Sequence, residues 1–151
     1  MHMAWKIRDR TFNWGEKTYL MGILNVTPDS FSDGGEFATV ETALIQARDM
    51  IAHGVDIIDL GGESTRPHAE SVSVEQELQR VIPVIEQLRQ ITQRPISIDT
   101  TKAEVARQAI ASGADLVNDI SGGTFDPQMF PTVAQLNVPI ILMHIRGNPQ
   151  T

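Results

Sequence analysis

Hydrophobic and polar residues follow one another along the chain in blocks whose period changes regularly. Short, continuous apolar runs, which are typical of buried strands, cover residues 18–24, 55–60, 95–99, 115–119 and 138–144. Apolar residues that recur every three or four positions predict helices at 40–54, after Ser73, from Thr101 to Gly113, and at about 127–136. This repeated alternation of strand and helix predicts an α/β fold with a parallel sheet and right-handed crossovers.

Two of the predicted helices begin with a capping signal. Ser73 is followed three residues later by Gln76, which predicts a capping box at the start of the second helix. Thr101 and Glu104 have the same spacing and predict a second capping box. Pro83 falls inside the second helix and is expected to bend it or divide it, because proline has no backbone donor.

One internal repeat supports this order of elements. The segments AHGVDIIDL (52–60) and ASGADLVND (111–119) align without a gap, and each passes from a helix end through a glycine and an aspartate into a strand. The residues at 4–14 alternate loosely and predict a β-hairpin. We therefore expect residues 1–151 to form a single domain, with this hairpin followed by β/α units from residue 18 onward.

Every predicted strand ends on a polar side chain. These residues are Asn25, Asp59, Asp99, Asn118 and His144. One such residue means little, because turns favour Asn and Asp. The carboxyl ends of parallel strands share one edge, however, and β/α proteins bind their ligands there. Five polar ends at one edge therefore predict a ligand site.

The predicted loops at that edge are also unusually long. NVTPDSFSDGGEF follows the first strand and GGESTRPHAESVS follows the second, whereas the opposite edge has short turns such as HG and SG. Phe31 lies in the middle of the first loop, where a large apolar ring has no reason to stay in water. Long loops on one edge and tight turns on the other are typical of β/α enzymes.

Composition narrows the function further. The 151 residues are 41% hydrophobic and 21% charged, which is typical of a soluble globular domain, and no apolar run is long enough to predict a membrane span. There is no cysteine, which excludes disulfides and thiolate metal sites and is consistent with an expected cytoplasmic location. The net charge of −7 argues against nucleic acid as a partner. An anionic ligand would need a metal ion or a local cluster of basic side chains.

The motifs LNVTPDSFSDGG, DLGGESTRP, SIDTTKAEVA, VNDISGG and LMHIRGNPQT resemble those of the dihydropteroate synthase family, the folate-pathway enzymes inhibited by sulfonamides. The resemblance implies a (β/α)8 TIM barrel, of which this chain holds about the first five strands. It also implies the condensation of 4-aminobenzoate with dihydropterin-methyl diphosphate to give dihydropteroate and pyrophosphate. Family members are longer, so we expect an N-terminal portion that is inactive as it stands, from an enzyme that forms a homodimer.

The resemblance assigns three strand-end residues, and Met143 beside a fourth strand end, to the pterin diphosphate. Asn25 is the expected ligand of a Mg²⁺ ion, which prefers oxygen donors and often shares them with phosphate. Asp99 is expected to accept two ring N–H bonds of the pterin, and Asn118 offers both a donor and an acceptor to the same edge. Met143 is assigned to the flat face of the pterin, although a methionine ending an apolar strand is equally well explained as core.

Five loop residues complete the assignment. The resemblance implies that Thr65 contacts the diphosphate, while Arg66 and Pro67 shape the aminobenzoate side. Phe31 is expected to pack on the aminobenzoate ring when the first loop closes and excludes water, and Asp33 helps to steer that closure. With Asp99, the residues Arg66, Phe31 and Asp33 are the candidates for catalysis.

Three residues are given weaker roles. Asp59 is expected to support the second loop from behind rather than contact the ligand. Lys102 is interpreted as a surface residue at the start of a helix, and His144 as an edge residue without a role in proton transfer.

Three alternative functions stay open from sequence alone. The pterin-binding methyltransferases that act on methyltetrahydrofolate share the barrel, but they should lack TPDSFSDGG and ESTRP. A flavodoxin-like binding module fits the chain length, although it leaves both long loops unexplained. A fragment that binds pterin without catalysis is the third alternative, and calorimetry with a pterin distinguishes the three.

Overall fold

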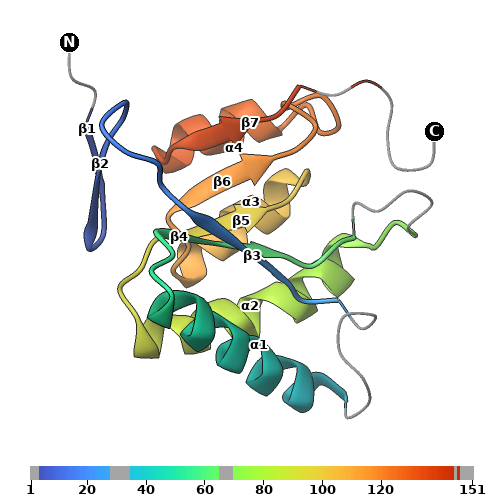
Figure 1. Ribbon diagram of the computed structural model, residues 1–151. Coiled ribbons are helices and arrows are strands. Elements are labelled where there is room, and N and C mark those ends of the chain that lie inside the picture. The colour runs from blue at the N-terminus through green and yellow to red at the C-terminus, as the bar shows by residue number, and fades with distance from the viewer. Residues whose placement is uncertain (1–3, 28–34, 65–69, 145, 147–151) are drawn as a thin grey trace.

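The computed structural model describes residues 4–27, 35–64, 70–144 and 146. They form an antiparallel hairpin and a five-stranded parallel sheet in the order β3-β4-β5-β6-β7 (Figure 1). The sheet strands are β3 (Met21–Asn25), β4 (Ile57–Gly61), β5 (Ile96–Asp99), β6 (Leu116–Asp119) and β7 (Ile140–Leu142). The helices between them are α1 (Gly35–Ala52), α2 (Val74–Ile91), α3 (Ala103–Ser112) and α4 (Met129–Leu136). The predicted alternation of strand and helix is therefore confirmed.

The main core lies between the sheet and the helices. Alternate residues of the central strands, such as Leu60 on β4 and Ile98 on β5, are fully buried against the helices. Val81 and Ile85 on α2 belong to the same buried cluster, one helical turn apart. Because side chains alternate across a strand, the polar residues between these apolar ones face the other side of the sheet. That second face carries the candidate site.

The first and last strands of the sheet are shorter than the apolar runs predict. Residues 18–20 precede β3, and Tyr19 packs against Phe12 of the hairpin instead of entering the sheet. The last strand ends at Leu142, so His144 lies beyond it. Tyr19 before β3 packs on the hairpin and Val138 before β7 packs on the main core, and hydrophobicity alone does not distinguish these contacts from sheet pairing.

The two predicted capping boxes have different outcomes. At α2 the box is present, because Ser73 Oγ accepts from Gln76 N at 3.2 Å and Gln76 Oε1 accepts from Ser73 N at 3.0 Å. The helix also runs through Pro83 without being divided. At α3 the prediction is wrong, because the N-cap residue is Lys102 and Ala103 N donates to Asp126 Oδ2 at 2.8 Å. A carboxylate distant in sequence thus caps this helix.

Replacing Ser73 with alanine should destabilise the protein by about 1 kcal/mol, since the first turn of α2 loses its capping acceptor. Urea unfolding measures the change in the free energy of unfolding. Ser71→Ala is the matched control, because Ser71 is exposed and precedes the helix. Equal losses in the two variants would contradict a capping contribution.

The predicted N-terminal hairpin is confirmed and closes one end of the sheet. Its strands are β1 (Ala4–Ile7) and β2 (Arg10–Asn13). Ile7 and Phe12 are buried together with Ile57 and Leu116, which are the first residues of β4 and β6. The hairpin therefore covers the amino ends of the strands, and the strand arrows in Figure 1 point away from it.

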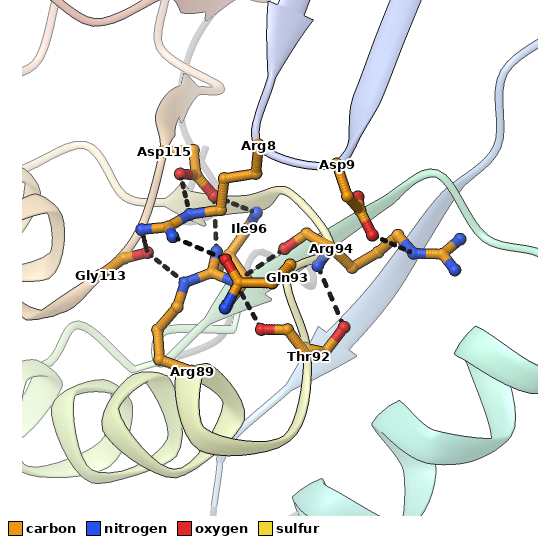
Figure 2. A network of polar contacts seen from close by, with 9 residues as sticks. All are labelled: Arg8, Asp9, Arg89, Thr92, Gln93, Arg94, Ile96, Gly113 and Asp115. Atoms are coloured by element: carbon orange, nitrogen blue, oxygen red, sulfur yellow. Dashed lines mark hydrogen bonds and ion pairs between the residues drawn. The ribbon is translucent and has the colours of Figure 1, made fainter.

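A polar network fastens the hairpin turn to the sheet (Figure 2). Asp115, just before β6, accepts from Arg8 Nε through Oδ1 and from Arg89 Nη2 through Oδ2, each at 2.5 Å. Its Oδ2 also accepts the backbone N–H of Ile96 at 2.9 Å. Asp56, the equivalent residue of the internal repeat, accepts the N–H of Leu20 in the same way at 2.8 Å. The two aligned aspartates of the repeat therefore have the same role. Each precedes one strand and binds the backbone at or just before the start of the neighbouring strand.

None of the helices in the described ranges combines the length and apolar character that crossing a membrane requires.

Candidate functional site

The sheet register brings three of the predicted site residues to one edge. Asn25 on β3 lies beside Gly61 on β4, Gly61 beside Asp99 on β5, and Asp99 beside Asn118 on β6. Residues opposite one another in parallel strands point to the same face. Asn25, Asp99 and Asn118 therefore share one edge and one face, as the sequence pattern predicts. Asn25 is exposed there, and the other two are half-buried.

Asp59 does not end its strand. It lies two residues before the end of β4, opposite Ile23 and Ser97, and it is only 3% exposed. Ser97 Oγ donates to Asp59 Oδ1 at 2.5 Å, and Asn118 Nδ2 donates to Oδ1 at 3.3 Å and to Oδ2 at 3.2 Å. The contacts described for Asp59 join it to Ser97 and Asn118, and its expected support of the second loop, whose residues 65–69 lie outside the described ranges, stays a prediction. Alternate strands of a barrel share a layer, which places Asp59 on β4 and Asn118 on β6 together.

The carboxylate of Asp59 orients the amide of Asn118. An ionised carboxylate only accepts hydrogen bonds, so Nδ2 must face it, and Oδ1 of the amide is directed away from Asp59. Burial raises the pKa of Asp59, while the bonds from Ser97 and Asn118 lower it. Asn118 therefore presents an acceptor of defined orientation to the face that it shares with Asp99.

Asp99 has a strongly perturbed acidity. Burial, together with the negative charges of four neighbouring carboxylates, raises the pKa of Asp99 to about 7. These neighbours are Asp59, Glu77, Asp119 and Glu63. A perturbed carboxyl beside a fixed amide, at the ligand-binding edge of a β/α sheet, is typical of a functional site.

Met143 and His144 lie just beyond β7, and Met143 N donates to Asp119 O at 3.2 Å. Met143 is 45% exposed in this chain, so it is accessible at this edge, and its assignment to the pterin face stays a prediction. The remaining site predictions, Phe31, Asp33, Thr65, Arg66 and Pro67, lie outside the described residues. Their assigned roles stay predictions.

The structure corrects the prediction for Lys102 and adds Glu77, which the sequence analysis does not name. Lys102 is predicted to be a surface residue, but its side chain is only 22% exposed and forms ion pairs with Glu63 and Glu77. Glu77 is fully buried. A signal for Glu77 was available, because it lies four residues before Val81 on the inward face of α2, where an apolar residue is normal.

The fold and this edge define a class, a β/α barrel protein with its ligand site at the carboxyl ends of the strands. Residues 21–151 match the family described as "Pterin binding enzyme". The chain belongs to this family.

Curated relatives support the same grouping. A dihydropteroate synthase from Synechocystis is 64% identical over 140 residues, which cover 93% of this chain and 48% of the relative. A dihydropteroate synthase from Bacillus subtilis is 55% identical over 134 residues, which cover 89% of this chain and 47% of the relative. The chain thus spans about half the length of the curated relatives it matches.

Solved structures agree in fold. A dihydropteroate synthase from Clostridium difficile, determined in the presence of pteroic acid, has a TM-score of 0.87 and is 50% identical, covering 89% of this chain and 51% of that one. The Xanthomonas albilineans enzyme with 4-aminobenzoic acid has a TM-score of 0.87 and is 46% identical, covering 96% of this chain and 53% of that one. These similarities confirm the family resemblance and the partial (β/α)8 barrel, rather than a flavodoxin-like open sheet.

Proposed function

We propose that this chain is the pterin-binding part of a dihydropteroate synthase. The complete enzyme would join 4-aminobenzoate to dihydropterin-methyl diphosphate, giving 7,8-dihydropteroate and pyrophosphate. The observation that carries the proposal is the placement of Asp99 and Asn118 side by side on one edge and face of the sheet. The names of the relatives favour this reaction over the methyltransferase alternative.

The proposed role of Asp99 is to bind the amino group and the neighbouring N–H of the pterin ring. When ionised, its carboxylate accepts both bonds and rejects rings that lack these donors. Asn118, held by Asp59, presents its Oδ1 to the same heterocycle. Loss of pyrophosphate leaves positive charge on the pterin methylene, and a nearby carboxylate stabilises that charge electrostatically. In this scheme, the reaction requires no covalent nucleophile from the chain.

We include Mg²⁺ in the proposal, with Asn25 as its protein ligand. The side chain of Asn25 is exposed at the carboxyl end of β3, and its amide oxygen is a donor of the kind that Mg²⁺ prefers. Among the described residues, no group of three or more His, Cys, Asp or Glu side chains is placed to hold a metal ion. A bound Mg²⁺ would neutralise charge on the departing pyrophosphate. Asn25 would orient the ion relative to the pterin edge.

The loop roles extend the same proposal. Thr65 would contact the diphosphate, and Arg66 and Pro67 would shape the aminobenzoate subsite. Met143, half-exposed next to β7, would pack on the pterin face. Assembly as a homodimer and inhibition by sulfonamides are predictions from the family resemblance, and location in the cytoplasm is a prediction from the absence of cysteine.

Replacing Phe31 with alanine in the complete enzyme should raise the KM for 4-aminobenzoate about tenfold or more, because an aromatic contact and water exclusion are lost. The KM for the pterin diphosphate should change much less. Steady-state kinetics with each substrate varied in turn measures both values. Equal increases in the two KM values would contradict closure of the first loop over the aminobenzoate.

Calorimetry on the 151-residue chain tests the proposed function. The chain should bind a pterin and should not turn over the pterin diphosphate with 4-aminobenzoate. A chain that is folded but does not bind pterin would refute the proposal. Turnover by the 151-residue chain would show instead that this chain alone suffices for catalysis.

A further inference from the structure

Lys102 occupies a position that helix physics disfavours. It is the N-cap residue of α3, where Ser, Thr, Asp and Asn are preferred and where the helix dipole repels a positive charge. Its side chain makes no capping bond to the described helix, and Asp126 Oδ2 accepts the N–H of Ala103 instead. A residue that conflicts with its local structure is expected where another interaction requires it.

That interaction is a partly buried group of two carboxylates around the ammonium. Lys102 Nζ lies 2.7 Å from Glu77 Oε1 and 3.2 Å from Glu63 Oε2. Glu77 is fully buried, and its Oε2 has no hydrogen-bond partner among the described residues. The ammonium of Lys102 is therefore the group that compensates for the burial of this carboxylate. Burial lowers the pKa of Lys102, but the bonds and charges of Glu77 and Glu63 raise it above its usual value, so the side chain stays charged.

Both ends of the β4–α2 loop are tied to this group. Glu63, two residues after β4, accepts the N–H of Val72 through the same Oε2 at 2.9 Å, which joins the start of the loop to its end. Arg80 Nη1, on α2, donates to Gly62 O at 2.8 Å. Lys102 itself follows β5, three residues after Asp99. The contacts therefore connect the base of the loop, the first turn of α2 and the end of β5.

We propose that Lys102 is a positioning residue that, through Glu63 and Glu77, holds the base of the β4–α2 loop beside the pterin-binding edge. The base consists of Gly62, Glu63 and Val72. This inference rests on the proposed function, which assigns diphosphate and aminobenzoate contacts to the loop. Lys102 acts through the two glutamates and does not contact the ligand.

Amide hydrogen exchange at Val72 in the 151-residue chain reports on the loop base. Lys102→Met should accelerate this exchange about tenfold or more, because Glu63 loses the charge that holds it in place. Lys102→Arg keeps a charged donor and should restore most of the protection. Lys6→Met, at an exposed lysine of β1, is the matched control and should leave Val72 unchanged. Unaltered exchange at Val72 in Lys102→Met would overturn the proposal.

A double variant separates positioning from stability. Lys102→Met alone leaves Glu77 buried without a counter-charge, and the chain would be destabilised. Lys102→Met/Glu77→Met replaces the pair with apolar side chains of similar volume, which is often neutral for stability. This variant should have the same midpoint of urea unfolding as the wild-type chain, while its Val72 amide still exchanges rapidly. Slow exchange at Val72 in the double variant would refute a positioning role.

Ligand affinity provides the functional readout. Calorimetry compares the dihydropterin-methyl diphosphate with the same pterin lacking the diphosphate. In Lys102→Met, affinity for the diphosphate ligand should fall about tenfold, while affinity for the bare pterin stays within about twofold. Equal losses for both ligands, or none, would contradict the positioning role and leave the proposed function intact. A wild-type chain that binds neither ligand would contradict the proposed function itself.

Discussion

Replacing Asp99 with asparagine should remove pterin binding and at the same time stabilise the fold above pH 7. The pterin loses two hydrogen bonds to a charged acceptor, so its affinity should fall at least about a hundredfold. The stability gain has a different origin. A carboxylate that is buried among other carboxylates carries an unfavourable charge, and asparagine does not carry it.

The pH dependence of this effect follows from the raised pKa of Asp99. The ordinary value is 3.8 and the value in the folded chain is about 7, so between these limits the folded state keeps a proton that the unfolded state releases. Stability contributed by protonated Asp99 is therefore present at low pH and is lost as the pH rises through 7. At about 1.4 kcal/mol per pKa unit, the difference between 3.8 and about 7 means that the Asp99→Asn variant should gain on the order of 4 kcal/mol at pH 8 and little at pH 4.

Urea unfolding at pH 4 and pH 8, together with calorimetry on a pterin, measures both effects. Asp49→Asn is the matched control, because the Asp49 side chain is 74% exposed and lies on α1. In the wild-type chain, pterin affinity should also rise as the pH increases through about 7, since the ionised carboxylate is the binding form. A variant that is less stable at pH 8, or that binds pterin like the wild type, would contradict this account.

Replacing Asp115 with alanine should destabilise the fold by about 3–5 kcal/mol. The carboxylate accepts bonds from Arg8, from Arg89 and from the backbone of Ile96 (Figure 2). The Arg89 side chain is only 12% exposed. Burial lowers the pKa of Arg89 and the charge of Asp115 raises it, so removal of the carboxylate leaves a partly buried guanidinium without its counter-charge.

Thermal or urea unfolding measures this loss, and Glu104→Ala is the matched control. Glu104 also binds an arginine, Arg107, but the pair is exposed on α3 and should contribute little to stability. A second variant, Asp115→Asn, keeps an acceptor for the Ile96 N–H and should lose less. Equal and small effects at Asp115 and Glu104 would mean that the hairpin network does not hold the fold together.

The order of the elements and the edge that carries the site follow from the amino-acid sequence alone. Strand and helix differ in the period of their apolar residues, and a parallel sheet gathers every carboxyl strand end on one side. Asn25, Asp99 and Asn118 could therefore be placed together without coordinates. Ser73 and Gln76 were also predictable, because a capping box lies within a single turn of helix.

Which charged residues contact one another depends on the folded arrangement of the elements. Asp59 contacts Asn118 across 59 residues of sequence, Lys102 reaches Glu63 and Glu77, and Asp126 caps α3 in place of a residue near its start. Such pairs depend on strand register, barrel layering and helix packing, and local periodicity does not encode them. The sequence does not show whether a charged residue is surrounded by water or contacts a buried partner. The contacts of Lys102 and Asp59 could therefore be identified only in the folded structure.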